Sequence, residues 1–193
     1  MACIPRRAGV RRDPLTIAAA LGAWLGGSLI VLADGRRGLA LGLGVSGAAM
    51  AALALPGGQP AGAAALLAGG LVAAALRWRA GPTGWGLMEP GSTPRIILIA
   101  VVAVLTLWIA LTVSSGDDAA LRFAVLAVIT LAAARLVQAR DDAASLTAAG
   151  ALALALGVAA QIVDPSPAPV VFGLAGLVAV TSSVFSPKQP VGT

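Results

Sequence analysis

The chain has 193 residues, of which 59% are hydrophobic and 11% are charged, with 13 basic residues against eight acidic ones. A water-soluble domain carries about 25% charged residues, so this composition excludes a soluble fold. The arginines border apolar segments instead of forming one basic patch, which indicates membrane topology and excludes nucleic acid as a partner.

Seven apolar stretches, separated by charged residues, glycine or proline, predict transmembrane helices. Each has 16 to 19 residues, close to the roughly 20 that a helix needs to cross a hydrocarbon core of about 30 Å. The runs are continuous and do not alternate, which favours helices over a membrane β-barrel. The stretches are 15–33, 38–55, 61–76, 96–113, 119–137, 146–163 and 170–185.

We therefore predict an all-α, polytopic transmembrane helix bundle of about seven spans. In this interpretation residues 1–13 form a basic N-terminal tail, residues 14–186 form a single transmembrane domain, and residues 187–193 form a short disordered tail.

The first three stretches leave two alternatives to seven spans open. The stretch 15–33 follows a basic segment and ends in Val31-Leu32-Ala33, which suits signal peptidase, but its length exceeds the usual 7–15 residues of a signal peptide. We expect it to be retained as a helix. The stretches 38–55 and 61–76 consist mostly of alanine and glycine and are joined by an uncharged turn, so they form a re-entrant pair in the alternative.

Glycines one turn apart predict close helix packing in the first two stretches. Gly22 and Gly26 share one face of the first stretch, and Gly38 and Gly42 share one face of the second. Helices in lipid associate through such small-residue faces, because the two backbones can approach closely. The pattern does not say whether the partner is internal or another subunit.

The longest polar connection joins the third and fourth stretches and predicts contacts at the membrane surface. Its tryptophans suit the interfacial aromatic belt, and its arginines suit lipid headgroups. The alternative is a loop that docks a cytoplasmic partner, with Glu89 and Arg95 as polar contacts. The candidate contact residues are Arg77, Trp78, Arg79, Trp85, Glu89 and Arg95.

Two arginines lie inside the fifth stretch, one near each end. We expect Arg122 and Arg135 to extend their guanidinium groups to opposite membrane interfaces. In the alternative, Arg135 faces inward and pairs with Asp141, with Asp142 or with a partner chain, and it joins the candidate contacts for that reason.

The distribution of basic residues predicts an orientation but contains a conflict. From the second stretch onward the positive-inside rule places the C-terminus in the cytoplasm, whereas seven spans then place the arginines of the N-terminal tail outside. Spans one to three and four to six also have similar lengths and spacings, so an inverted repeat of the kind found in transporters is an open expectation.

The residues that the chain lacks exclude several kinds of chemistry. There is no histidine and no tyrosine, the single cysteine is Cys3, and the single lysine, Lys188, follows the last stretch. Histidine-ligated haem or metal, a histidine general base, a retinal Schiff base and an iron–sulfur cluster are therefore excluded. No acid lies in the middle of a stretch. We expect no cofactor, no metal and no enzymatic activity.

Two functional hypotheses follow. The first is a non-catalytic accessory or structural subunit of a larger energy-converting or transport complex, with the lipid bilayer and other membrane subunits as partners. The second is a small self-contained transporter or permease. An enzyme acting on a lipid-linked substrate is a weaker third hypothesis. In each case we expect a multi-pass protein of the cell membrane, either the inner or the plasma membrane.

Overall fold

Seven α-helices make up the described part of the chain. The computed structural model describes residues 14–80, 85, 93–113, 119–139, 141–164 and 167–185. The two predicted tails and the loop residue Glu89 lie outside these ranges. The helices are α1 (Pro14–Leu32), α2 (Arg36–Ala54), α3 (Pro60–Arg79), α4 (Thr93–Val113), α5 (Ala119–Gln138), α6 (Asp142–Val163) and α7 (Pro169–Val184).

Length and composition make six of these helices membrane spans. The helices α1 to α6 have 19 to 22 residues and are apolar enough to cross a bilayer, and at about 1.5 Å per residue they extend for roughly 28 to 33 Å. The helix α7 is apolar but has only 16 residues. The prediction of an all-α transmembrane bundle is confirmed, and the chain is an integral membrane protein.

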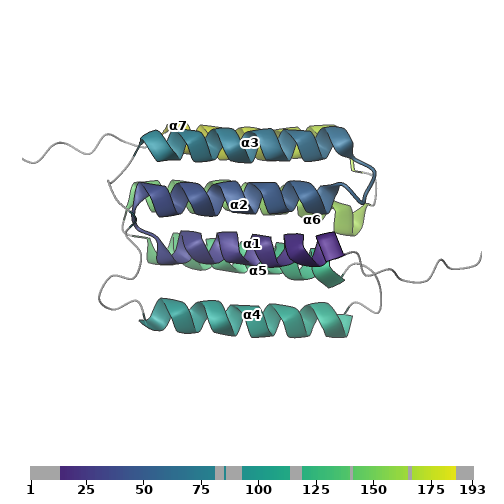
Figure 1. The fold of residues 1–193 in the computed structure, drawn as a ribbon, viewed down its shortest axis with the longest axis horizontal. Coiled ribbons are helices and arrows are strands. Elements are labelled where there is room, and N and C mark those ends of the chain that lie inside the picture. Colours follow the sequence, from purple (N-terminus) through teal and green to yellow (C-terminus); the bar gives the residue numbers. More distant parts are fainter. Residues whose placement is uncertain are drawn as a thin grey trace, which may run out of the picture.

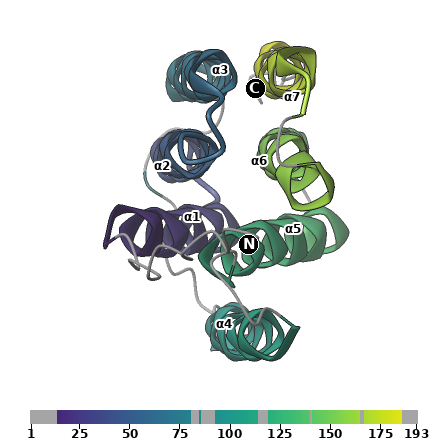
Figure 2. The same cartoon turned by 90° about the vertical axis from the view of Figure 1, so that its right-hand side faces the viewer.

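The helices form two rows of three, with one helix outside the rows. Figure 2 shows α1, α2 and α3 in one row and α5, α6 and α7 in the other. The helix α1 lies beside α5, α2 beside α6, and α3 beside α7, and each of these pairs is in contact. The helix α4 lies outside the rows, where it contacts α5 and α1 (Figure 1).

Neighbouring helices of the two rows run in the same direction. Asp34, just after α1, contacts Arg135 in the last turn of α5, and Arg77 near the end of α3 contacts Ser182 near the end of α7. The ends of paired helices therefore coincide. The alternative of an inverted repeat of spans one to three and four to six does not match this arrangement, because α4 lies outside the rows and the second row is α5 to α7.

Glycines allow the helix backbones to touch at successive crossings. A Cβ atom placed on Gly26 of α1 would lie 2.9 Å from the carbonyl oxygen of Gly42 in α2. One on Gly47 of α2 would lie 2.8 Å from the Cα of Gly70 in α3. Such distances leave no room for a side chain, so these glycines set how closely the helices of the first row approach.

Two predicted alternatives conflict with this packing. The helices α2 and α3 are full-length spans, and α2 is the most buried of the six long helices, so the re-entrant pair is wrong. The helix α1 packs against α2 and α5 and buries Ala23, Ile30 and Val31. Cleavage after Ala33 would remove one helix of the first row, and this packing therefore favours a retained first helix.

Candidate functional site

Basic side chains gather at one end of the bundle. Because successive helices alternate in direction, this arginine-rich end is where α1, α3, α5 and α7 finish and where α2, α4 and α6 begin. Among the described residues, the opposite end has one arginine, Arg122. The described arginines of the arginine-rich end are Arg36, Arg37, Arg77, Arg79, Arg95 and Arg135.

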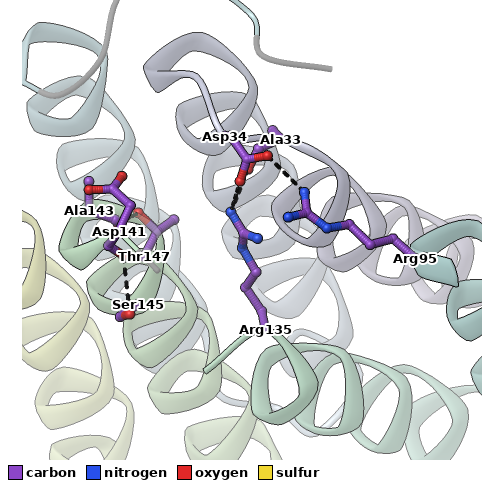
Figure 3. A network of polar contacts seen from close by, with 8 residues as sticks. All are labelled: Ala33, Asp34, Arg95, Arg135, Asp141, Ala143, Ser145 and Thr147. Atoms are coloured by element: carbon purple, nitrogen blue, oxygen red, sulfur yellow. Dashed lines mark hydrogen bonds and ion pairs between the residues drawn. The ribbon is translucent and has the colours of Figure 1, made fainter. Parts of the chain in front are cut away.

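A carboxylate lies between two of these arginines at the edge of the bundle. Asp34 accepts a hydrogen bond of 2.7 Å from Nη1 of Arg95, at the start of α4, and its other oxygen contacts Nη2 of Arg135 in α5. Figure 3 shows the Asp34 carboxylate between the two guanidinium groups. Asp34 and Arg95 are each 27% exposed, whereas Arg135 is only 2% exposed. One acid thus joins the ends of α1, α4 and α5.

The short connection between α1 and α2 positions this carboxylate. Ala33 continues the last turn of α1 through a 2.9 Å bond to the carbonyl of Leu29, and Gly35 is extended and precedes α2. The Nη2 of Arg135 also donates a 3.1 Å hydrogen bond to the carbonyl oxygen of Ala33. Carbonyls at the C-terminal end of a helix lack hydrogen-bond partners within the helix, and Arg135 supplies a partner for one of them in α1. Its positive charge also interacts favourably with the negative end of the dipole of α5, its own helix.

Electrostatics keep Asp34 ionised. Burial raises the pKa of the Asp34 carboxyl, but the hydrogen bonds from Arg95 and Arg135 and the charges of both arginines outweigh burial and hold that pKa below its ordinary value. Arg135 depends on this ion pair more than Arg95 does, because it is buried. Removing the carboxylate partner of a buried guanidinium lowers the stability of a protein by about 3 to 5 kcal/mol.

A second buried arginine joins the other side of the bundle. Arg77 in the last turn of α3 is fully buried, and its Nη2 donates a 3.3 Å hydrogen bond to the carbonyl oxygen of Ser182 in α7. Its Nε and Nη1 atoms have no hydrogen-bond partner within the described residues. Asp141, just before α6, supplies a negative charge that acts on Arg77, and its own Oδ2 is buried with no hydrogen-bond partner among the residues that the structure describes.

The third pair of parallel helices has the same type of contact at the opposite end. Nε2 of Gln161 in α6 donates a 3.3 Å hydrogen bond to the carbonyl oxygen of Ala54, the last residue of α2. In all three pairs, a polar side chain near the C-terminal end of one helix binds a carbonyl at the C-terminal end of its parallel neighbour. Within the described ranges these cross-caps link the two rows, together with the Asp34–Arg135 ion pair.

The structure places the predicted contact residues in three different settings. Arg135 and Arg77 are buried against other helices at the arginine-rich end, so neither has the exposed guanidinium group that the sequence led us to expect. The inward alternative for Arg135 holds, but its acid is Asp34, not Asp141 or Asp142. Arg95 is bound to Asp34.

The remaining predicted residues lie on the surface or in helix contacts. Trp78 and Trp85 are each 45% exposed and Arg79 is exposed, so their contact with a partner stays a prediction. Beside Gly26 and Gly42, a Cβ on Gly22 would contact Ala49, and one on Gly38 would lie 3.0 Å from the backbone oxygen of Trp85.

Sequence reasoning missed Asp34 and Gln161 as linking residues. Asp34 follows an apolar run and precedes two arginines, which is typical of a solvated turn. The sequence signal that could have indicated a buried contact is the position of Asp34 before a glycine and a helix of small residues. The short turn there holds the carboxylate close to the bundle.

The chemistry of this end of the bundle is electrostatic attachment. Within the described ranges, no group of three or more His, Cys, Asp or Glu residues is placed to hold a metal ion. The Asp34 carboxylate has both oxygens engaged by arginines. The arrangement holds helix ends together.

Comparisons with family models, with curated proteins and with solved structures found no match. The fold and the charged end define a polytopic transmembrane helix bundle whose parallel helices are joined by cross-caps.

Proposed function

We propose that the chain is a non-catalytic subunit of a larger membrane assembly in the cell membrane, of an energy-converting or transport kind. The observation that carries this proposal is the use of the charged groups. Asp34 accepts hydrogen bonds from Arg95 and Arg135, and Arg135 also donates to the carbonyl at the end of α1. Side chains engaged in this way are suited to holding a shape rather than to turning over a substrate.

Three of the hydroxyl groups buried along the helices support the same function. Ser28, Thr106 and Thr147 each donate a hydrogen bond to a carbonyl four residues earlier in their own helix, at 2.8, 2.6 and 2.6 Å. Hydroxyls bonded in this way are satisfied locally and offer no row of groups to a solute. Together with the glycine contacts between backbones, they favour a closed bundle over a permeation path.

The outlying position of α4 leaves a large apolar surface for neighbours. The helix contacts α5 and α1, and its large side chains elsewhere are exposed, with Val104 at 67% and Trp108 at 63%. Lipid or another membrane subunit can cover such a surface, since both are apolar.

Purification from the native membrane in a mild detergent tests the proposal. We expect a second membrane protein to co-purify in a fixed ratio with the tagged chain. Trp108→Ala on α4 and Leu177→Ala on α7, a residue that is 57% exposed, form a matched pair that locates the contact. A lone monomer or homodimer that transports a solute in liposomes would contradict the proposal.

Arg77 favours a second candidate, a small permease. An ionisable residue at membrane depth is a functional hypothesis by default, and Arg77 is fully buried with two nitrogens that have no hydrogen-bond partner in the described part of the chain. An anion that crosses the bundle would use these donors. Anion flux in liposomes that Arg77→Leu abolishes, while the folded fraction is unchanged, would establish this candidate.

A further inference from the structure

An apolar groove lies on the outer face of α2 and α3. Its volume is about 370 Å³, and no other described helix covers the face of α2 and α3 that points away from α6 and α7 (Figure 2). The groove is at the low end of the size range of small-ligand sites. Its lining residues are Ala40, Leu41, Gly44, Val45, Ala48, Leu71, Ala74, Ala75 and Trp78.

Small residues at one-turn spacing create this groove. Ala40, Gly44 and Ala48 follow one another at intervals of four on α2, and Ala74 and Ala75 face them from α3. Leu41 and Leu71, which are 40% and 51% exposed, form its walls. A row of small side chains between larger ones leaves an apolar channel on this outward face.

The groove begins near the arginine-rich ends of α2 and α3. Its α2 lining extends from Ala40 to Ala48, about 12 Å along the helix axis at 1.5 Å per residue. Half of a hydrocarbon core of about 30 Å is about 15 Å. On α2 the groove therefore runs from the second turn to just past the middle of the helix, a length comparable to that of one acyl chain in a leaflet.

A cation and an aromatic ring mark the headgroup end of the groove. The Arg37 guanidinium carbon lies 6.0 Å from the ring centroid of Trp78, at the distance of a cation–π contact. Trp78 lines the groove and is 45% exposed, and Arg37 is exposed. The positive charge of Arg37 therefore lies over the Trp78 ring at the mouth of the groove, at the outer limit of a cation–π contact.

We propose that this groove is a binding site for one anionic phospholipid. One acyl chain lies between α2 and α3, and the phosphate binds the Arg37 guanidinium above Trp78. The charge complementarity at the mouth selects an anionic headgroup, because a basic side chain at an anionic membrane surface contributes about a fivefold gain in affinity.

The test uses the full chain in detergent micelles and measures the thermal unfolding midpoint as phosphatidylglycerol or phosphatidylcholine is added. A ligand that binds the folded state raises the midpoint. We expect phosphatidylglycerol to raise it at lower concentrations than phosphatidylcholine. Ala48→Leu fills the groove from an exposed position and should weaken the phosphatidylglycerol effect about tenfold. Arg37→Gln should weaken it about fivefold.

Matched variants separate the groove from a general lipid effect. Ala100→Leu adds the same side chain at an exposed site on α4, and Arg79→Gln removes an exposed arginine that does not line the groove. Both should titrate like the unaltered chain. If Ala48→Leu lowers the unfolding midpoint even without lipid, a second pair of variants repeats the test. Val45→Phe then fills the groove from another exposed position, and Val101→Phe on α4 is its control.

Three results would overturn the site. The first is an equal response to both lipids. The second is an equal loss in the groove variants and their α4 controls, or in Arg37→Gln and Arg79→Gln. The third is a groove variant that releases a co-purifying protein while its phosphatidylglycerol titration is unchanged, which would assign the groove to a partner helix.

Discussion

In water-soluble proteins large apolar side chains are usually buried, but a comparison of α2 with α4 shows the opposite. The helix α4 is the richest in isoleucine, valine and leucine and has only 22% of its span buried, whereas α2 is largely alanine and glycine and has 67% buried. Lipid tails are as apolar as leucine, so no hydrophobic force moves large side chains inward, while small residues let backbones touch. Of these two helices, the one rich in small residues lies in the core and the one rich in large apolar residues faces outward.

The largest effect is expected at Asp34, which leads into α2 and anchors α4. Asp34→Ala leaves the buried Arg135 without its carboxylate, so the free energy of unfolding should fall by about 3 kcal/mol or more. Denaturant unfolding in micelles measures this change. Asp142→Ala, at an exposed acid of the same end, is the control and should change stability by less than about 1 kcal/mol.

A leucine exchange tests the comparison between α2 and α4 directly. Gly47→Leu in α2 forces a side chain against the backbone of Gly70, so we expect a loss of about 3 kcal/mol, at the upper end for overpacking. Ala100→Leu in α4 adds a similar side chain toward lipid and should leave the unfolding midpoint unchanged. Equal losses in the two variants would show that burial does not distinguish the helices.

A smaller effect is expected where α4 joins the bundle. Arg95→Gln removes a pair in which both side chains are 27% exposed, and half-exposed pairs contribute up to about 1 kcal/mol. The local effect should be clearer, because hydrogen exchange at the first turn of α4 should accelerate while exchange in α2 stays the same. Acceleration in both helices would mean that α4 supports the whole bundle.

The smallest effect is expected from the titration of Asp34, which changes the stability of the protein only in acid. The pKa of Asp34 is lower in the folded state than in the unfolded state, so its stabilisation is complete above the ordinary value of about 3.9 and is lost as pH falls through the folded value. In the unaltered chain, the thermal unfolding midpoint should therefore decrease when the pH is lowered below about 4. Asp34→Asn should lack this component, and identical pH profiles would refute it.

The fold was more predictable from the sequence than the site. Continuous apolar runs of nearly membrane length fix the helices, because lipid forces each backbone to bond within itself. The row order is not encoded locally, since α1 pairs with α5 through residues such as Asp34 and Arg135 that are 101 positions apart. Arg77 was expected at the headgroups because it precedes a polar loop, but its place on the inner face of α3 depends on where α7 lies.

The cross-caps also impose an order on biosynthesis. Asp34 leaves the ribosome 61 residues before Arg95 and 101 before Arg135, while Arg77 precedes Ser182 by 105 residues and Ala54 precedes Gln161 by 107. The first three helices therefore enter the bilayer with an unpaired carboxylate, an unpaired arginine and open carbonyls. They complete their bonding only when the second row has been inserted, so the first row has its full set of polar contacts only in the finished chain.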